Sequence, residues 1–198
     1  MKKLITSILL IGMWAFSHAQ DTNRVVKTTG HVSANGKNIN YEATTGFFAL
    51  KDNTGKAVAD IFFVAYTKND VSDVRKRPIT FVFNGGPGSS SAWLHMGAIG
   101  PMKVSTTEYG KTELPPTTFN LVNNDQCWLD ITDLVFIDPV GCGFSKPIGE
   151  EKTDKFYGYE NDIKTTGDFI NQWTSQNKRW GSPKFLAGES YGTTRACG

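Results

Sequence analysis

The most regular pattern along the chain is a set of three short runs of apolar residues that polar residues scarcely interrupt. They occupy positions 79–83, 134–137 and 184–187. A strand that is apolar along its whole length is buried on both of its faces, as in a parallel sheet covered by helices. The three runs therefore predict the centre of a parallel sheet.

A helical pattern lies between the last two runs. Within residues 159–174, Tyr159, Ile163, Ile170 and Trp173 recur at a spacing that places them on one face of a helix. A second helix is expected to begin within residues 89–96. Strands that alternate with helices in this way favour an α/β fold with helices on both faces of the sheet.

The first third of the chain has a different pattern. Between residues 25 and 66, β-rich segments alternate with turn residues, and Asn35-Gly36 gives a strong hairpin signal. We therefore expect antiparallel strands to open the fold and parallel strands to follow. Residues 106–124 are rich in Thr, Pro and Asn, which indicates a long surface excursion.

The N-terminus has the pattern of a secretory signal peptide. Lys2 and Lys3 precede an uncharged apolar run at 4–16, and small residues follow at the expected cleavage site after Ala19. The run is shorter than the roughly 20 residues that cross a bilayer. We expect residues 1–19 to be removed and the mature protein, with no membrane span, to be secreted or periplasmic.

Composition narrows the possible partners. The 198 residues contain 21 Lys and Arg and 19 Asp and Glu, so loss of Lys2 and Lys3 brings the formal charge to zero. A neutral chain is a poor candidate for binding nucleic acid. Of the three cysteines, Cys127 and Cys142 flank a predicted strand and are expected to lie too far apart to pair. Buried free thiols and a partner beyond residue 198 both stay open, and the oligomeric state is not indicated.

The first chemical signal is Gly-Glu-Ser-Tyr-Gly at positions 188–192, directly after the third apolar run. Gly-x-Ser-x-Gly between a strand and a helix is the pattern of a nucleophile elbow, a sharp turn that presents the serine hydroxyl at the edge of the sheet. It predicts Ser190 as a nucleophile. The backbone N–H of Tyr191 is then one expected donor to the oxyanion of an acyl-transfer reaction.

A second signal follows the first apolar run, where Asn-Gly-Gly-Pro-Gly occupies positions 84–88. A Gly-rich loop after an earlier strand supplies the other oxyanion donor in this architecture, and Gly85 and Gly86 suit a close approach of backbone to substrate. A phosphate-binding loop is a weaker alternative, because no Gly-Lys-Ser/Thr follows. Neither a metal ion nor a cofactor is expected.

Three motifs together carry a family resemblance. Asn-Gly-Gly-Pro-Gly-Ser-Ser-Ser (84–91), Asp-Pro-Val-Gly-Cys-Gly-Phe-Ser (138–145) and Gly-Glu-Ser-Tyr-Gly (188–192) resemble successive motifs of the serine carboxypeptidases, a branch of the α/β-hydrolases. The resemblance runs from about residue 79 to the end of the chain. Two positions depart from the family: Ser89 replaces a frequent Cys, and Cys142 replaces a frequent Thr.

The resemblance implies a role for each motif residue. Ser190 is the implied nucleophile, and Gly86 and Tyr191 lend the N–H groups of the oxyanion hole. Asn84 and the Gly85 N–H, together with a protonated Glu189, are implied to hold the free C-terminal carboxylate of a peptide substrate.

The remaining members of a catalytic triad are not evident. In this fold the acid and the histidine follow the serine along the chain, yet the eight residues after Ser190 contain neither. His31 and His95 precede Ser190, and a packing role is expected for both. Asp138 is expected to brace its loop. The sequence therefore predicts that residues 20–198 are the N-terminal part of the hydrolase domain, truncated after the elbow.

Three functions stay open on these grounds. The favoured one is an exported serine carboxypeptidase that releases C-terminal amino acids through an acyl-enzyme at Ser190, with the isolated chain inactive. The second is an acyltransferase on the same scaffold. The third is a non-catalytic remnant of the family.

Overall fold

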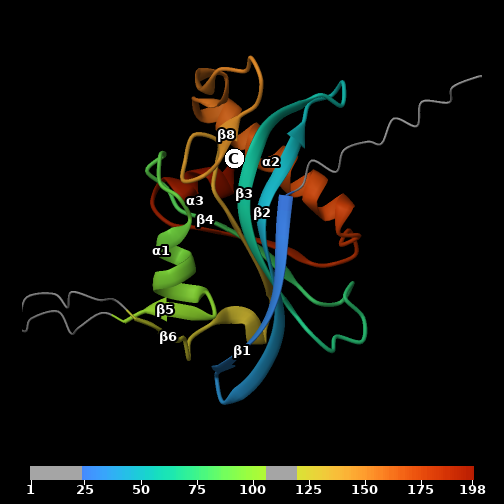
Figure 1. Ribbon diagram of the computed structural model, residues 1–198, viewed down its shortest axis with the longest axis vertical. Helices are drawn as coiled ribbons and strands as arrows, with labels where there is room; N and C mark the ends of the chain where they lie inside the picture. The colour runs from blue at the N-terminus through green and yellow to red at the C-terminus, as the bar shows by residue number, and fades with distance from the viewer. Residues whose placement is uncertain (1–23, 106–119) are drawn as a thin grey trace, which may run out of the picture.

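The structure is a computed structural model that describes residues 24–105 and 120–198. The predicted signal peptide and most of the predicted excursion lie outside these residues. Within them, a seven-stranded sheet has the order β1-β2-β3-β7-β4-β9, and β8 pairs with β3 (Figure 1). Its strands are β1 (Arg24–Ala34), β2 (Lys37–Lys51), β3 (Ala57–Lys68), β4 (Ile79–Phe83), β7 (Asp133–Ile137), β8 (Lys146–Pro147) and β9 (Lys184–Gly188).

Shorter elements surround this sheet. A small second sheet pairs β5 (Met102–Val104) with β6 (Leu121–Asn123). The helices are α1 (Ala92–Leu94), the π-helical turn η1 (His95–Ile99), the 3-10 turns η2 (Trp128–Asp130) and η3 (Thr153–Phe156), α2 (Tyr159–Gln176) and α3 (Tyr191–Cys197). No helix in residues 24–105 and 120–198 is long and apolar enough to cross a membrane.

The opening of the fold is antiparallel, as predicted. β1 pairs with β2 across a two-residue turn in which Asn35 has a φ of 50° and Gly36 a φ of 73°. Both central residues of this turn type need a positive φ, which Asn and Gly adopt more readily than other residues. β2 then pairs with β3 in an antiparallel register that reaches Lys51.

The three apolar runs form the predicted parallel part of the sheet. β4 lies between β7 and β9 and is parallel to both. Side chains alternate between two cores: Phe81 of β4 and Val135 of β7 belong to one, and Val82 and Phe136 belong to the other. Phe169 of α2 packs in the first core, and elements on the opposite face complete the second. Figure 1 accordingly shows α1 and α2 on different sides of the sheet.

The buried face of α2 agrees with the predicted one in part, since Trp173 is buried and Ile170 packs partly buried against the core, but Tyr159 is not covered. Phe169 and Trp173 are buried against the sheet, with ring centroids 5.2 Å from Phe48 and 5.6 Å from Phe81 respectively, whereas Tyr159 is 52% exposed. The C-terminal half of the helix covers the sheet, and Gln172 bonds to the backbone of Lys51 in β2. The first turn does not reach the core, so an apolar residue there follows the helical spacing without being buried.

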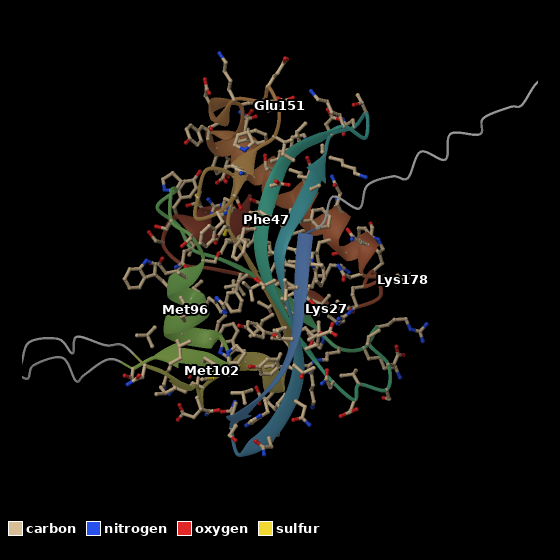
Figure 2. All side chains as sticks on the ribbon, in the orientation of Figure 1. Lys27, Phe47, Met96, Met102, Glu151 and Lys178 are labelled. Atoms are coloured by element: carbon tan, nitrogen blue, oxygen red, sulfur yellow. The ribbon has the colours of Figure 1, made fainter. Side chains whose placement is uncertain are left out.

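The helix expected within residues 89–96 is short. One α-helical turn, α1, continues directly into the π-helical turn η1. Figure 2 labels Met96 on this segment, and its side chain is 36% exposed. The segment follows the Gly-rich loop after β4, so its place bears directly on the candidate site.

Candidate active site

Ser190 occupies a sharp turn between β9 and α3. Its φ of 55° and ψ of −126° are unusual for a residue with a side chain. The turn is closed by Gly192 N, which donates to the Glu189 carbonyl at 2.8 Å, and by Thr193 N, which donates to the Ser190 carbonyl at 2.9 Å. Ser190 itself is exposed. Strand, turn and helix thus have the geometry of a nucleophile elbow.

The Gly-rich loop lies against this elbow. β4 and β9 are parallel neighbours, and Phe83 pairs with Gly188, so the segments that follow them meet at one edge of the sheet. A Cβ on Gly85 would lie 2.4 Å from the backbone N of Tyr191, which leaves no room for a side chain. Gly86 has a φ of 107°, a conformation that glycine adopts readily. The predicted loop and elbow are therefore in direct backbone contact.

Asn84 and Glu189 form a side-chain pair beside Ser190. The Asn84 Nδ2 donates to Glu189 Oε2 at 3.1 Å, across 105 residues of sequence. The Asn84 Oδ1 accepts a hydrogen bond from Leu94 N at 3.0 Å, which orients the amide with its NH₂ group toward Glu189. Asn84 is fully buried and Glu189 is exposed. The pair joins a fixed donor to a carboxyl group that solvent can reach.

Asp138 supports the neighbouring loop. Its Oδ1 accepts a hydrogen bond from Ser91 N at 2.8 Å, and burial raises the pKa of its carboxyl group. Ser145 Oγ donates to the Asp138 carbonyl at 2.6 Å and accepts from Phe62 N at 2.7 Å. These contacts match the bracing role expected from the sequence.

The two described histidines have other partners than Ser190. His95 Nε2 lies 2.7 Å from the Tyr66 hydroxyl, and its ring centroid lies 4.5 Å from that of Phe136. Burial lowers the pKa of His95 to about 4. His31 lies in β1 opposite Asn40 and is exposed. Among residues 24–105 and 120–198, neither histidine hydrogen-bonds the Ser190 hydroxyl.

A cavity of about 380 Å³ adjoins the elbow and the Gly-rich loop. The thiol of Cys142 forms part of its wall and donates to the Pro87 carbonyl at 3.3 Å. Burial raises the pKa of this thiol to about 11, which keeps it in the unreactive neutral form. The wall is mostly apolar and includes Val140, Phe156, Tyr157 and Tyr191.

All three cysteines are free. Cys127 and Cys142 are buried, and Cys197 is exposed near the end of α3. The described residues contain no group of three or more His, Cys, Asp or Glu side chains placed to hold a metal ion.

Sequence analysis did not single out Arg195, which lies in α3 five positions after Ser190. Its side chain is fully buried and forms an ion pair with Asp162 of α2. No local sequence pattern marks it, because arginine is mostly exposed in folded proteins and the partners of Arg195, Asp162 and Asn84, are distant in sequence.

The fold and the site together define the class of protein. Antiparallel strands lead into a parallel sheet, and a strained serine turn faces a Gly-rich loop at one edge of it, which is the arrangement of an α/β-hydrolase. A sequence model described as serine carboxypeptidase matches residues 34–194. The chain therefore belongs to the serine carboxypeptidase family.

Relatives and one solved structure agree with this assignment. Serine carboxypeptidase-like 29 of Arabidopsis thaliana is 26% identical over 95% of this chain and 37% of its own length. Serine carboxypeptidase-like 20 of the same plant is 30% identical over 74% of this chain and 28% of its own length. The chain thus spans about a third of the length of the curated relatives it matches.

The crystal structure of Kex1(Δ)p, a prohormone-processing carboxypeptidase from Saccharomyces cerevisiae, has a similar fold. The TM-score is 0.60 at 29% identity, over 76% of this chain and 31% of that one. The similarity supports the predicted α/β-hydrolase fold.

Proposed function

We propose that this chain supplies the nucleophile and the carboxylate-binding residues of a serine carboxypeptidase. The proposed reaction removes C-terminal amino acids from peptides through an acyl-enzyme at Ser190. The observation that carries it is the pairing of Asn84 with Glu189 at 3.1 Å beside the elbow. A donor and an acid group next to a nucleophile suit a substrate that carries its own carboxylate close to the bond being cleaved.

In the proposed reaction, Ser190 Oγ attacks the carbonyl carbon of the last peptide bond. The backbone N–H groups of Gly86 and Tyr191 donate to the oxyanion that develops, and the C-terminal amino acid leaves as the amine. Water then attacks the ester and restores the serine. A histidine base and an acid that orients it are also required. Neither described histidine occupies that position. We therefore propose that the base and the acid come from further residues of a longer protein, the full-length protein, to which this chain belongs.

The carboxylate of the substrate is assigned to the Asn84 amide, the Gly85 N–H and Glu189. A protonated Glu189 donates a hydrogen bond to the carboxylate, whereas two ionised carboxyl groups in contact repel each other. The proposed contact therefore requires that Glu189 carries its proton when the substrate is bound.

The test of this assignment uses the full-length protein and measures KM against pH. Wild type is expected to show a KM that rises with pH, and Glu189→Gln a flatter profile, because an amide donates at every pH. Glu160→Gln, an exposed position at the start of α2, is the matched control and should keep the wild-type profile. A Glu189→Gln profile that coincides with wild type would contradict the role of Glu189.

The nucleophile is tested by labelling with a fluorophosphonate, which reacts with activated serines. Full-length protein is expected to label stoichiometrically at Ser190, and Ser190→Ala is expected to remain unlabelled. An assay with an added acceptor alcohol then separates hydrolysis from acyl transfer. Products that form only when the acceptor is present would contradict the peptidase proposal.

Export is also part of the proposal. The sequence pattern of residues 1–19 supports cleavage after Ala19 and a secreted or periplasmic protein. Intact mass of the mature protein tests it, since a chain that begins at Gln20 is expected and one that retains Met1 to Ala19 would contradict it.

A further inference from the structure

The side chain of Arg195 joins three segments around the candidate site. Its Nη1 donates to the backbone carbonyl of Asn84 at 2.7 Å, and its Nε donates to Asp162 Oδ2 at 2.9 Å. Arg195 itself belongs to α3, the helix that directly follows Ser190. One guanidinium therefore connects the Gly-rich loop, α2 and the elbow.

The surroundings hold this guanidinium in one place. Its side chain is fully buried, and its Cζ lies 5.4 Å from the ring centroid of Phe83 and 5.3 Å from that of Tyr191. A buried cation is costly unless it is paired and hydrogen-bonded, and here one carboxylate, one carbonyl and two aromatic faces surround it. Arginine suits such a place because its planar group donates in several fixed directions at once.

Arg195 binds the backbone carbonyl of Asn84, the residue whose side-chain amide faces the Glu189 carboxyl group. The Asn84 side chain is fixed by Leu94 N on one side and by Glu189 on the other. Its backbone is fixed by Arg195. Loss of the guanidinium frees the point at which β4 passes into the Gly-rich loop, so Asn84 and Gly85 can shift relative to Ser190.

We propose that Arg195, held by Asp162, is a positioning residue that sets the carboxylate-binding pair Asn84–Glu189 at a fixed distance from Ser190. This inference rests on the proposed carboxypeptidase function. It assigns the preference for a free C-terminal carboxylate in part to a residue that touches neither the substrate nor the reacting atoms. Arg195 acts through the backbone of Asn84.

The experiment compares two substrates in the full-length protein: one blocked peptide with a free C-terminal carboxylate and the same peptide with a C-terminal amide. The readout is the ratio of kcat/KM for the acid to kcat/KM for the amide. Arg195→Met is expected to lower this ratio at least tenfold, mainly through a higher KM for the acid. Arg195→Lys, which keeps the charge but replaces the planar fork of donors with a single nitrogen, is expected to fall between Arg195→Met and wild type.

Arg179→Lys is the matched control. Arg179 is also buried and paired with an aspartate, Asp133, but it precedes β9 and lies at the other end of the strands. Its substitution is expected to lower stability and leave the acid-to-amide ratio unchanged. If Arg195→Met does not fold, the ratio in Arg195→Lys decides the matter.

The possible outcomes distinguish a failure of the positioning role of Arg195 from a failure of the proposed carboxypeptidase function. Wild type that neither labels at Ser190 nor prefers the acid contradicts the proposed function. If the wild type prefers the acid but the Arg195 variants keep the wild-type ratio, only the positioning role is overturned. The same holds if these variants lose activity on the acid and on the amide equally. A ratio that falls in Arg195→Met and partly recovers in Arg195→Lys supports it.

Discussion

Asp133 and Arg179 form a buried ion pair in which Asp133 Oδ2 accepts from Arg179 Nη1 at 2.8 Å. The other carboxylate oxygen accepts from Arg77 Nε at 2.6 Å and from Lys68 N at 3.0 Å. Asp133 begins β7, Arg77 lies just before β4, and Arg179 lies before β9. One carboxylate thus joins the starts of the three parallel strands, at the end of the sheet away from Ser190.

Asp133→Ala is expected to lower the free energy of unfolding by about 3–5 kcal/mol, because it leaves two buried guanidinium groups without their carboxylate. Chemical denaturation measures the change. Asp73→Ala is the control, since Asp73 pairs with the exposed side chain of Arg75 and such a surface pair contributes little to stability. Equal losses in the two variants would contradict the central role of Asp133.

His95 predicts a dependence of stability on pH. Burial lowers its pKa from 6.5 to about 4, so the folded protein holds a neutral imidazole where the unfolded chain binds a proton. The stability is fully present above about pH 6.5 and falls as the pH drops toward 4. The whole loss is roughly 3 kcal/mol at 1.36 kcal/mol per pKa unit.

Denaturation at a series of pH values measures this effect. His95→Gln is expected to remove that part of the slope between pH 6.5 and 4, because glutamine does not titrate. His31→Gln changes an exposed histidine and should keep the wild-type slope. The interpretation fails if His95→Gln and wild type lose stability in parallel over this range.

Alanine substitutions at two glycines of the Gly-rich loop are expected to have different effects on the labelling of Ser190. A Cβ on Gly85 would meet Tyr191 N at 2.4 Å and the Glu189 carbonyl at 2.8 Å, all backbone that cannot move alone. Gly85→Ala is expected to push the loop off the elbow and slow fluorophosphonate labelling of Ser190 at least tenfold. A Cβ on Gly88 would have no atom within 4 Å, so Gly88→Ala should label at the wild-type rate. Similar rates in both variants would show that the contact is unimportant.

Asp138 offers a test of the bracing role. Asp138→Ala leaves Ser91 N without its acceptor and is expected to lower stability by about 1–3 kcal/mol. Asp138→Asn keeps an acceptor oxygen and should lose less. Ser190 is expected to label in Asp138→Asn, since the Asp138 carboxylate accepts from the Ser91 amide and hydrogen-bonds neither histidine of the described residues. Loss of labelling as complete as in Ser190→Ala would instead point to a catalytic acid.

The parallel strands were predictable because burial on both faces leaves a local mark, a run without polar residues. β4 was predicted at its observed bounds, and β9 was predicted one residue short. The hairpin was predictable for a similar reason, since the Asn35-Gly36 turn is specified by its own two residues. The place of Ser190 followed from the order of strand, turn and helix, whereas the roles of Asn84, Gly85 and Glu189 came from the family resemblance.

Long-range contacts have no comparable signal in the local sequence. Arg195 and Asn84 are 111 residues apart, and no local periodicity distinguishes an arginine that enters the core from one that points to solvent. The burial of the first turn of α2 was wrongly predicted for a related reason. Helical spacing shows which residues share a side, but the sheet decides which turns are covered, and it covers Phe169 rather than Tyr159.

The φ of 55° at Ser190 has a thermodynamic consequence. A residue with a side chain held in such a conformation destabilises the fold by about 1–3 kcal/mol, whereas glycine adopts it with little strain. Ser190→Gly should therefore give a protein that melts at a higher temperature and has no hydroxyl to react. The substitution that gives this backbone its highest stability removes the reactive hydroxyl. The strained turn therefore lowers the stability of the fold at the same residue that it presents as a nucleophile.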